Sequence, residues 1–261
     1  MQFRPCIDLH DGKVKQLVGS TLSDTNNIEA GGVTENFVSE RDAAYYAGLY
    51  KSDGLAGGHI ILLNKAGTPE YELSRAQGIK ALKAFPGGLQ IGGGINSSNA
   101  AEFLDAGASH VIVTSYVFSD GKICYNRLAE LKSEVGKKHV VLDLSCRKKD
   151  GNYYIVTDRW QKFTDEVLNV ELLDRLAEYC DEYLIHAVDV EGKVNGIEED
   201  VVCITGDSSI PVTYAGGISS VDDILKIKEL SAGRVNVTVG SALDLFGGSL
   251  KYKEVISCIQ S

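Results

Sequence analysis

Eight short runs rich in Val and Ile recur along the chain, and this repetition constrains the fold more than any other feature. Each run is bounded by turn residues and precedes a longer segment with helical periodicity, which is the pattern of strand–helix units in a parallel sheet. A closed barrel of eight such units typically takes about 250 residues, and the chain has 261. The sequence therefore predicts an α/β fold, a (βα)8 TIM barrel. The expected strands are residues 3–9, 59–63, 89–91, 110–114, 140–144, 183–187, 212–215 and 236–239.

Three helical segments begin after a residue that commonly caps a helix, namely Asp42, Ser97 or Ser98, and Ser220. Two of them run to a glycine, Gly107 or Gly233, where a left-handed residue usually ends a helix. The four prolines lie outside the helical patterns, and no segment rich in Gly, Ser and Pro divides the chain. We therefore expect residues 1–261 to form a single barrel domain.

The formal net charge is −10, from 26 Lys and Arg against 36 Asp and Glu. This balance argues against a protein that neutralises nucleic-acid phosphates or lies on an anionic membrane, so we expect neither partner. The six cysteines lie 22 or more residues apart, and no apolar run reaches the ~18 residues of a membrane span. The first residues already read as a strand, which leaves no room for a targeting segment. These features predict a reduced, cytoplasmic protein.

An internal repeat relates the two halves of the chain. Gly93 and Gly216 occupy matching Gly-Gly-Ile turns 123 residues apart, and Asp8 and Asp143 each end an apolar run at a spacing of 135. The strands after the two turns also match, with Ser115 and Ser241 separated by 126 residues. Three features in the same order at nearly one spacing predict two duplicated (βα)4 halves related by a pseudo-twofold axis.

The two glycine turns, GGGINSS and AGGISS, each lie between a predicted strand and a predicted helix. Glycine lets the backbone approach a ligand closely, and N–H groups at a helix start favour an anion, although a tight turn that binds nothing needs the same residues. The sequence predicts one phosphate site at Gly92, Gly93, Gly94, Thr114 and Ser115, and another at Gly216, Gly217, Gly240 and Ser241. Two such sites indicate a small bisphosphorylated ligand.

Asp8 and Asp143 follow the hydrophobic residues of the first and fifth predicted strands. The active sites of TIM barrels lie at the C-terminal ends of the strands, so these carboxylates should face each other across the mouth. Such a pair can divide acid and base roles if the two environments separate the pKa values. Either residue alone would more simply cap a helix, but their symmetry favours catalysis. The chain has no HExxH, GxSxG, Walker A or GxGxxG motif.

Six segments carry a family resemblance: CIDLHDGKVKQLVG (6–19), QIGGGI (90–95), VVLDLSCR (140–147), HAVDVEG (186–192), YAGGISSVDDI (214–224) and VGSALDLFGG (239–248). Together they resemble the ProFAR isomerases of histidine biosynthesis, where ProFAR is phosphoribosylformimino aminoimidazole carboxamide ribotide. The similarity covers nearly the whole chain and is greatest to the stand-alone fungal-type form. It implies a duplicated (βα)8 barrel that works as a monomer. The implied reaction is the Amadori rearrangement of a bisphosphorylated aminoaldose to an aminoketose, without metal or cofactor.

The resemblance also implies residue roles. Asp8 matches the general base that removes the C2 proton of the opened ribose, and Asp143 matches the general acid that protonates the ring oxygen. The two predicted phosphate sites match the phosphate sites of the family. Trp160, the only tryptophan, lies where bacterial relatives carry a Trp that stacks on the imidazole of the substrate. An ordinary packed Trp is an equally good interpretation of that residue.

Two positions depart from the bacterial pattern. Where bacterial enzymes carry an assisting Thr, this chain reads HAVDVEG, so the resemblance assigns that substrate-orienting role to His186 or Asp189, unless His186 is only a satisfied buried histidine. The Arg usual in the first strand–helix segment is replaced by Gln16, which makes Lys15 and Arg147 candidate substitutes in substrate binding.

Residues 19–37 are polar, rich in Gly, Asn and Thr, and aperiodic. A loop of this length in a compact domain is usually functional or disordered. Because it follows the first strand, we expect it to overhang the mouth as a mobile lid; a passive insertion is the alternative.

Three other functions remain open on the sequence alone. The cyclase subunit of imidazole glycerol phosphate synthase shares the fold, both Asp positions and the phosphate loops, but the segments CIDLHDGKVKQLVG and DLSCR fit the isomerase better. A phosphoribosylanthranilate isomerase would use a Cys and an Asp, and Cys6 lies on the same strand face as Asp8. A non-catalytic phospho-ligand-binding barrel would have no need of both Asp8 and Asp143.

Overall fold

The computed structural model describes residues 1–17, 35–158, 160–191 and 196–260. Eight parallel strands of this part lie side by side in chain order and form a barrel. They are β1 (Cys6–His10), β4 (Gly58–Leu62), β5 (Leu89–Gly92), β6 (Val111–Val113), β9 (Val140–Asp143), β13 (Glu182–His186), β14 (Val212–Ala215) and β15 (Val235–Val237). A parallel bridge between Phe3 and Val237 closes the ring, with the Arg4 N–H donating to the Val237 carbonyl at 2.9 Å.

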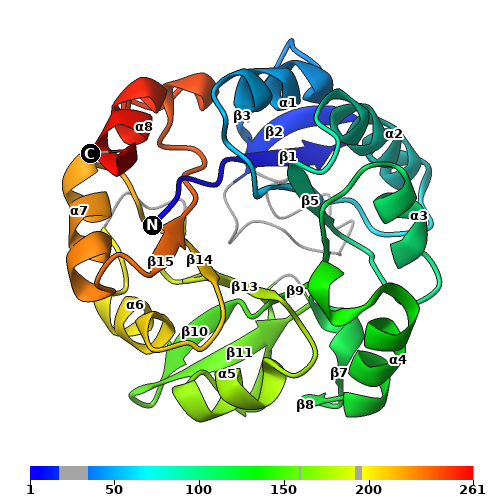
Figure 1. Cartoon of the computed structure of the whole chain (residues 1–261), viewed down its shortest axis with the longest axis vertical. Coiled ribbons are helices and arrows are strands. Elements are labelled where there is room, and N and C mark those ends of the chain that lie inside the picture. Colours follow the sequence, from blue (N-terminus) through cyan, green and yellow to red (C-terminus); the bar gives the residue numbers. More distant parts are fainter. Residues whose placement is uncertain (18–34, 159, 192–195, 261) are drawn as a thin grey trace, which may run out of the picture.

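A helix follows each barrel strand, and Figure 1 shows these helices as an outer ring around the strands. They are α1 (Ala43–Ser52), α2 (Pro69–Ala84), α3 (Ala100–Asp105), α4 (Tyr125–Val135), α5 (Val170–Leu176), α6 (Glu199–Gly206), α7 (Val221–Leu230) and α8 (Tyr252–Gln260). This alternation of eight strands and eight helices in the described part of the chain confirms the predicted (βα)8 barrel.

Among the helices of the described residues, none combines the length and the apolar character needed to cross a membrane.

The strands are buried on both faces, which is why each reads as a continuous apolar run. In β6, Val111 and Val113 belong to the large core between strands and helices, whereas Ile112 packs inside the barrel with Val141 and Leu184. A buried polar group also lies among the strands, where Glu182 accepts hydrogen bonds from Gln90 Nε2 at 3.0 Å and Thr213 Oγ1 at 2.7 Å and pairs with Arg4. These partners satisfy the carboxylate, as a buried charge requires.

Two of the three predicted helix caps are confirmed. The Asp42 side chain accepts the Tyr45 N–H at the start of α1, and Ser220 forms a capping box with Asp223 at the start of α7. The prediction of Ser97 or Ser98 for α3 was wrong, because Asn99 occupies the cap position and Ser98 instead donates to Asn96.

The two glycines predicted to end helices lie just beyond the last helical residues. Both Gly107 and Gly233 have positive φ angles, 110° and 71°. α3 ends at Asp105 and α7 at Leu230, and Ala232 is already left-handed after α7 with φ 49°.

The short antiparallel elements were not predicted. β2 (Lys13–Leu17) and β3 (Glu35–Val38) extend the sheet beside β1, and β10 (Cys146–Lys149), β11 (Asn152–Thr157) and β12 (Lys162–Val167) form a separate three-stranded sheet after β9. Smaller elements are β7 (Phe118–Ser119), β8 (Lys122–Ile123), η2 (Ser115–Val117), η3 (Lys137–His139) and η4 (Asp244–Phe246). Charged residues interrupt the hydrophobic pattern of β10 and β12, so the sequence shows no alternation that would predict these strands.

The expected lid at residues 19–37 is only partly within the described structure. Its last three residues belong to β3, which pairs with β2 through Gln16 and Phe37, so the prediction of an aperiodic loop was wrong there. The Phe37 ring packs against Phe246 at 5.9 Å between centroids, which explains why this end is a strand. Residues 18–34, which make up the rest of the predicted lid, lie outside the described residues.

The two glycine turns repeat the same close backbone approach in each half. Gly93 has φ 99°, and a Cβ there would lie 2.1 Å from the Leu62 carbonyl oxygen of the preceding strand. Gly216 has φ 114°, and a Cβ there would lie 2.6 Å from the Ala187 carbonyl oxygen. The sequence repeat is thus also a repeat of backbone geometry at these two turns, as two duplicated halves would produce.

We expect Gly216→Ala to destabilise the protein more than Gly136→Ala. Both glycines have positive φ, but a Cβ at Gly136 meets nothing within 4 Å, so that change carries only the strain of its backbone conformation (φ 79°, ψ 143°), about 1–3 kcal/mol. The Gly216 substitution adds a backbone clash. Urea unfolding with linear extrapolation measures both free energies. Equal losses would show that the close approach does not constrain the turn.

Candidate active site

Two connected pockets lie at the C-terminal ends of the barrel strands. The first, which we name the Gly216 lobe, is lined by Gly216, Gly217, Gly240 and Ser241, and the second, the Gly93 lobe, by Gly93, Gly94, Thr114, Ser115 and Trp160. Asp8, Gln16, His186 and Glu191 line both lobes. The two predicted glycine turns therefore lie at one mouth, on either side of a shared group of polar side chains.

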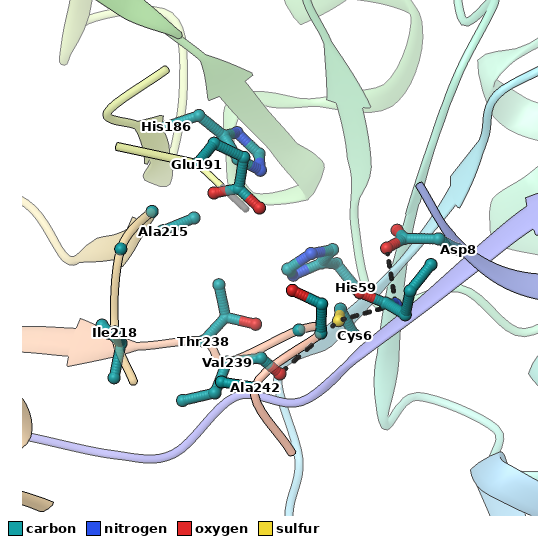
Figure 2. A pocket seen from close by; sticks show the side chains of 15 residues that line it. Cys6, Asp8, His59, His186, Glu191, Ala215, Ile218, Thr238, Val239 and Ala242 are labelled. Atoms are coloured by element: carbon teal, nitrogen blue, oxygen red, sulfur yellow. Dashed lines mark hydrogen bonds between the residues drawn. The ribbon is translucent and has the colours of Figure 1, made fainter. Parts of the chain in front are cut away.

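Asp8 lies on β1, and the amide of Gln16 on the adjacent β2 donates to its Oδ2 at 2.9 Å. Burial, reinforced by the nearby Glu191 carboxylate, raises the pKa of Asp8 from its ordinary value to about 7, although His186 and Gln16 oppose this rise. Figure 2 shows Asp8 on one side of the Gly216 lobe, with His186 and Glu191 next to one another on the other side. Asp8 thus holds its proton up to near-neutral pH.

Asp143 ends β9 and has a different environment. Its Oδ1 accepts the Ser145 N–H at 3.1 Å and the Ser145 hydroxyl at 2.9 Å, and its Oδ2 accepts the Thr114 hydroxyl at 3.3 Å. Burial alone would raise the pKa of Asp143, but the His186 charge and these donors outweigh burial and lower it. The two pKa values are therefore pushed in opposite directions, and Asp143, which the family resemblance matches to the acid, is the aspartate that is more stable as a carboxylate.

His186 ends β13 and lies next to Asp143, with 3.4 Å between Nδ1 and Oδ1. Only 15% of the His186 side chain and 12% of the Asp143 side chain are exposed. Burial would lower the pKa of His186, but the carboxylate of Asp143, with smaller contributions from Glu191 and Asp8, raises it to about 9.

Trp160 lies between β11 and β12 and lines the Gly93 lobe. Its indole Nε1 donates to the Ser145 hydroxyl at 2.9 Å, and its ring centroid is 5.8 Å from that of His186. The long segment after β9 therefore brings Trp160 back to the Asp143 end of the site. A ligand in the Gly93 lobe can contact the indole ring there.

Three of the sequence-predicted site residues do not line either lobe. Arg147 and Asp189 pair with each other, with 3.0 Å between Nε and Oδ1, and Asp189 also accepts the Lys148 N–H at 2.7 Å. Gly92 ends β5, where a Cβ would lie 2.9 Å from the Ile112 Cβ, so packing already explains this glycine. Among the candidate substitutes for the missing Arg, Lys15 pairs with Asp11 at 3.1 Å.

Sequence reasoning missed several residues that line the mouth, namely Gln16 as a partner of Asp8, Glu191, His59, Thr238, Asn64 and Lys65. A signal existed for Gln16, because KVKQL alternates directly after the first strand and could have been interpreted as a strand folding back on it. No local pattern marks Glu191 or His59. Among the described residues, no group of three or more His, Cys, Asp or Glu side chains is arranged to hold a metal ion.

The closed eight-stranded barrel, with two aspartates and two glycine turns at one mouth, places the chain among the TIM barrels, whose active sites lie at this end of the strands. The chain belongs to the histidine biosynthesis protein family, which it matches over residues 2–250. The family resemblance in the sequence is thereby confirmed.

Several similar proteins share the name of one isomerase. The chain is 55% identical over 258 residues to a chloroplastic 1-(5-phosphoribosyl)-5-((5-phosphoribosylamino)methylideneamino) imidazole-4-carboxamide isomerase of Medicago truncatula, covering 98% of this chain and 81% of that protein. Isomerases of the same name from Yarrowia lipolytica and Saccharomyces cerevisiae are each 44% identical. The alignments cover 98% and 95% of this chain, and 96% and 94% of those proteins.

We expect Asp8→Asn to stabilise the protein, and more at pH 8 than at pH 4. The folded-state pKa of about 7 lies above the ordinary 3.8, so the folded protein loses stability as pH rises between these values and the buried carboxylate ionises. An amide removes that penalty, and each kcal/mol gained raises Tm by roughly 2–4 °C in a chain of this size.

Thermal unfolding of both proteins across this pH range measures the effect. The control is Asp105→Asn, at an exposed position at the end of α3, which should show no such trend. A Tm difference for Asp8→Asn that is constant from pH 4 to pH 8 would contradict the raised pKa.

Proposed function

We propose that this protein is an aldose–ketose isomerase that converts ProFAR to the corresponding aminoketose by an Amadori rearrangement. The observation that carries the proposal is the arrangement of the mouth, in which two glycine-lined lobes flank Asp8, Asp143 and His186. A substrate with a phosphate at each end fits such a pair of lobes, with its reacting ribose between them. The names of the similar isomerases support the same reaction.

The proposed chemistry uses opposite ends of the shared group. At the Asp143 end, a proton goes to the ring oxygen, the C1–O bond breaks, and the nitrogen lone pair forms a C=N bond. Ionised Asp8 then takes the C2 proton, which gives an enaminol. Transfer of a proton to C1 and loss of the C2 hydroxyl proton complete the ketone. No other reactant is needed, because the substrate is only isomerised.

The phosphates would be held by backbone and hydroxyl groups. At the start of α7, the N–H groups of Ser219 and Ser220 already donate to Asp223 at 2.9 and 3.0 Å. In the Gly216 lobe, the phosphate would therefore be bound by the turn at Gly216 and by Gly240 and Ser241. In the Gly93 lobe, Thr114 and Ser115 complete the site, and Lys65 adds a cation to its lining.

We further propose that the chain acts as one barrel domain and as a monomer in the cytoplasm. All six cysteines are free thiols, which suits a reducing compartment. The unbroken ring of strands from β1 to β15 supports one domain. Light scattering of the purified protein measures the oligomeric state, and cell fractionation the compartment.

Replacing Asp8 or Asp143 by Asn should lower turnover of ProFAR by roughly 10²- to 10⁴-fold. The Asp8 change removes a proton transfer, and the Asp143 change removes the carboxylate on which protonation of the ring oxygen depends, while both keep the shape of the side chain. Ligand binding, measured by calorimetry with the ketose product, should persist. In the wild type, kcat/KM should rise through about pH 7 as Asp8 ionises. Ketose formation is followed without added ammonia or a second protein.

The control Asp105→Asn should keep wild-type turnover. Normal turnover in either active-site variant would refute the assignment of that aspartate. Binding without any turnover by the wild type would identify a phospho-ligand-binding barrel, and ammonia-dependent consumption of the aminoketose would identify a cyclase.

A further inference from the structure

The strongest unassigned feature of the mouth is the contact between His186 and Asp143. His186 Nδ1 lies 3.4 Å from Asp143 Oδ1, so that ring nitrogen is directed at the carboxylate. The opposite nitrogen, Nε2, is then the one that can meet a ligand, and His186 lines both lobes. A histidine held in this way by a carboxylate at one nitrogen has the geometry of a proton donor at the other.

Asp143 itself is poorly arranged to give a proton. Every hydrogen-bond donor described above for Asp143 stabilises its ionised form, and the Ser145 hydroxyl is in turn held by the Trp160 indole at 2.9 Å. Protonating Asp143 would weaken these contacts. The structure thus supplies a fixed carboxylate beside a buried imidazole rather than a free carboxylic acid.

We propose that His186, oriented by Asp143, is the group that delivers the proton to the ring oxygen. This inference rests on the proposed isomerase function and refines its acid step. His186 is then a catalytic residue, and Asp143 is the residue that positions it and balances its charge. The role goes beyond the substrate orientation expected from the sequence.

The proton balance closes within the site. The His186 imidazolium gives its Nε2 proton to the ring oxygen as the C1–O bond breaks, while its Nδ1–H stays bonded to Asp143. Asp8 takes the C2 proton and later returns it to C1. The C2 hydroxyl gives its proton back to His186 Nε2 as the ketone forms. Both side chains end in their starting states.

The surroundings of His186 favour the imidazolium. Carboxylates face it from three elements, namely Asp143 from β9, Asp8 from β1 and Glu191 from the segment after β13. From β4, His59 packs its ring edge-on at 6.5 Å between centroids, and burial, followed by the charge of His186, lowers the pKa of His59 to about 3. His59 is therefore neutral. With its own pKa raised to about 9, His186 holds a proton at neutral pH.

The first test needs no substrate. Trp160 is the only tryptophan, and a protonated imidazole beside an indole quenches its fluorescence, so Trp160 reports on His186. We expect the fluorescence of the wild type to rise through about pH 9. The transition should vanish in His186→Gln and persist in His139→Gln, whose ring packs on His110 instead. A wild type without this transition would overturn the proposal.

The second test is the pH dependence of turnover. Wild-type kcat/KM should fall above about pH 9 as His186 loses its proton. His186→Gln should lose roughly 10²- to 10⁴-fold in kcat, and its remaining activity should no longer fall at alkaline pH. Product binding by His186→Gln, followed by calorimetry, checks that the mouth is intact, and His186→Asn serves as a second variant.

The outcomes separate the two proposals. If the wild type forms no ketose from ProFAR, the proposed function fails and this inference fails with it. If the wild type is active and His186→Gln keeps more than about a tenth of its kcat with the alkaline fall retained, Asp143 is the acid and only the present inference is overturned.

Discussion

The parallel bridge between Phe3 and Val237 is the contact on which the rest of the molecule depends. It joins the first barrel strand to the last, and without it the eight strands would form an open sheet. Closure of the ring turns the C-terminal ends of all eight strands toward one mouth. Asp8 and Asp143, which are far apart in sequence, can therefore act on one ligand, and the two glycine turns can bind its two ends.

The carboxylates at the mouth would repel an anionic ligand, and the protonation states of the site reduce this repulsion. A bisphosphorylated ligand must enter a site with carboxylates at Asp8, Asp143 and Glu191, in a chain that is already strongly acidic. Burial raises the pKa of Asp8 to about 7, which reduces the negative charge near neutral pH, and burial also raises the pKa of Glu191. The imidazolium of His186 adds a positive charge at the centre, and the two glycine turns lie on either side of this group of side chains.

Sequence reasoning succeeded where the physical signal is local. The barrel strands are buried on both faces, so each leaves a continuous apolar run, and the predicted ranges agree with the observed strands to within a few residues. The turns at Gly93 and Gly216 were found because a backbone approach that excludes a Cβ leaves glycine in the sequence. Asp8 and Asp143 stand directly after such strands, which made them visible.

The rest depends on contacts between distant segments. β10 and β12 carry charged residues at exposed positions and gain their stability by pairing with β11, so their own residues give little strand signal. The contact between His186 and Asp143 joins neighbouring barrel strands 43 residues apart. A sequence can suggest that both residues lie at the mouth, but the distance between their side chains comes only from the packing of β9 against β13.

The three-stranded sheet after β9 has a consequence for the acid end of the site. Its β11 and β12 return the chain so that Trp160 reaches Ser145, and Ser145 in turn holds Asp143 against His186. The orientation of the imidazole thus depends on an element outside the barrel, through a chain of hydrogen bonds that runs from the indole to the carboxylate. A barrel alone places functional groups at a common rim, but it does not fix their angles. Here an inserted sheet fixes the angles of the side chains at the Asp143 end of the mouth.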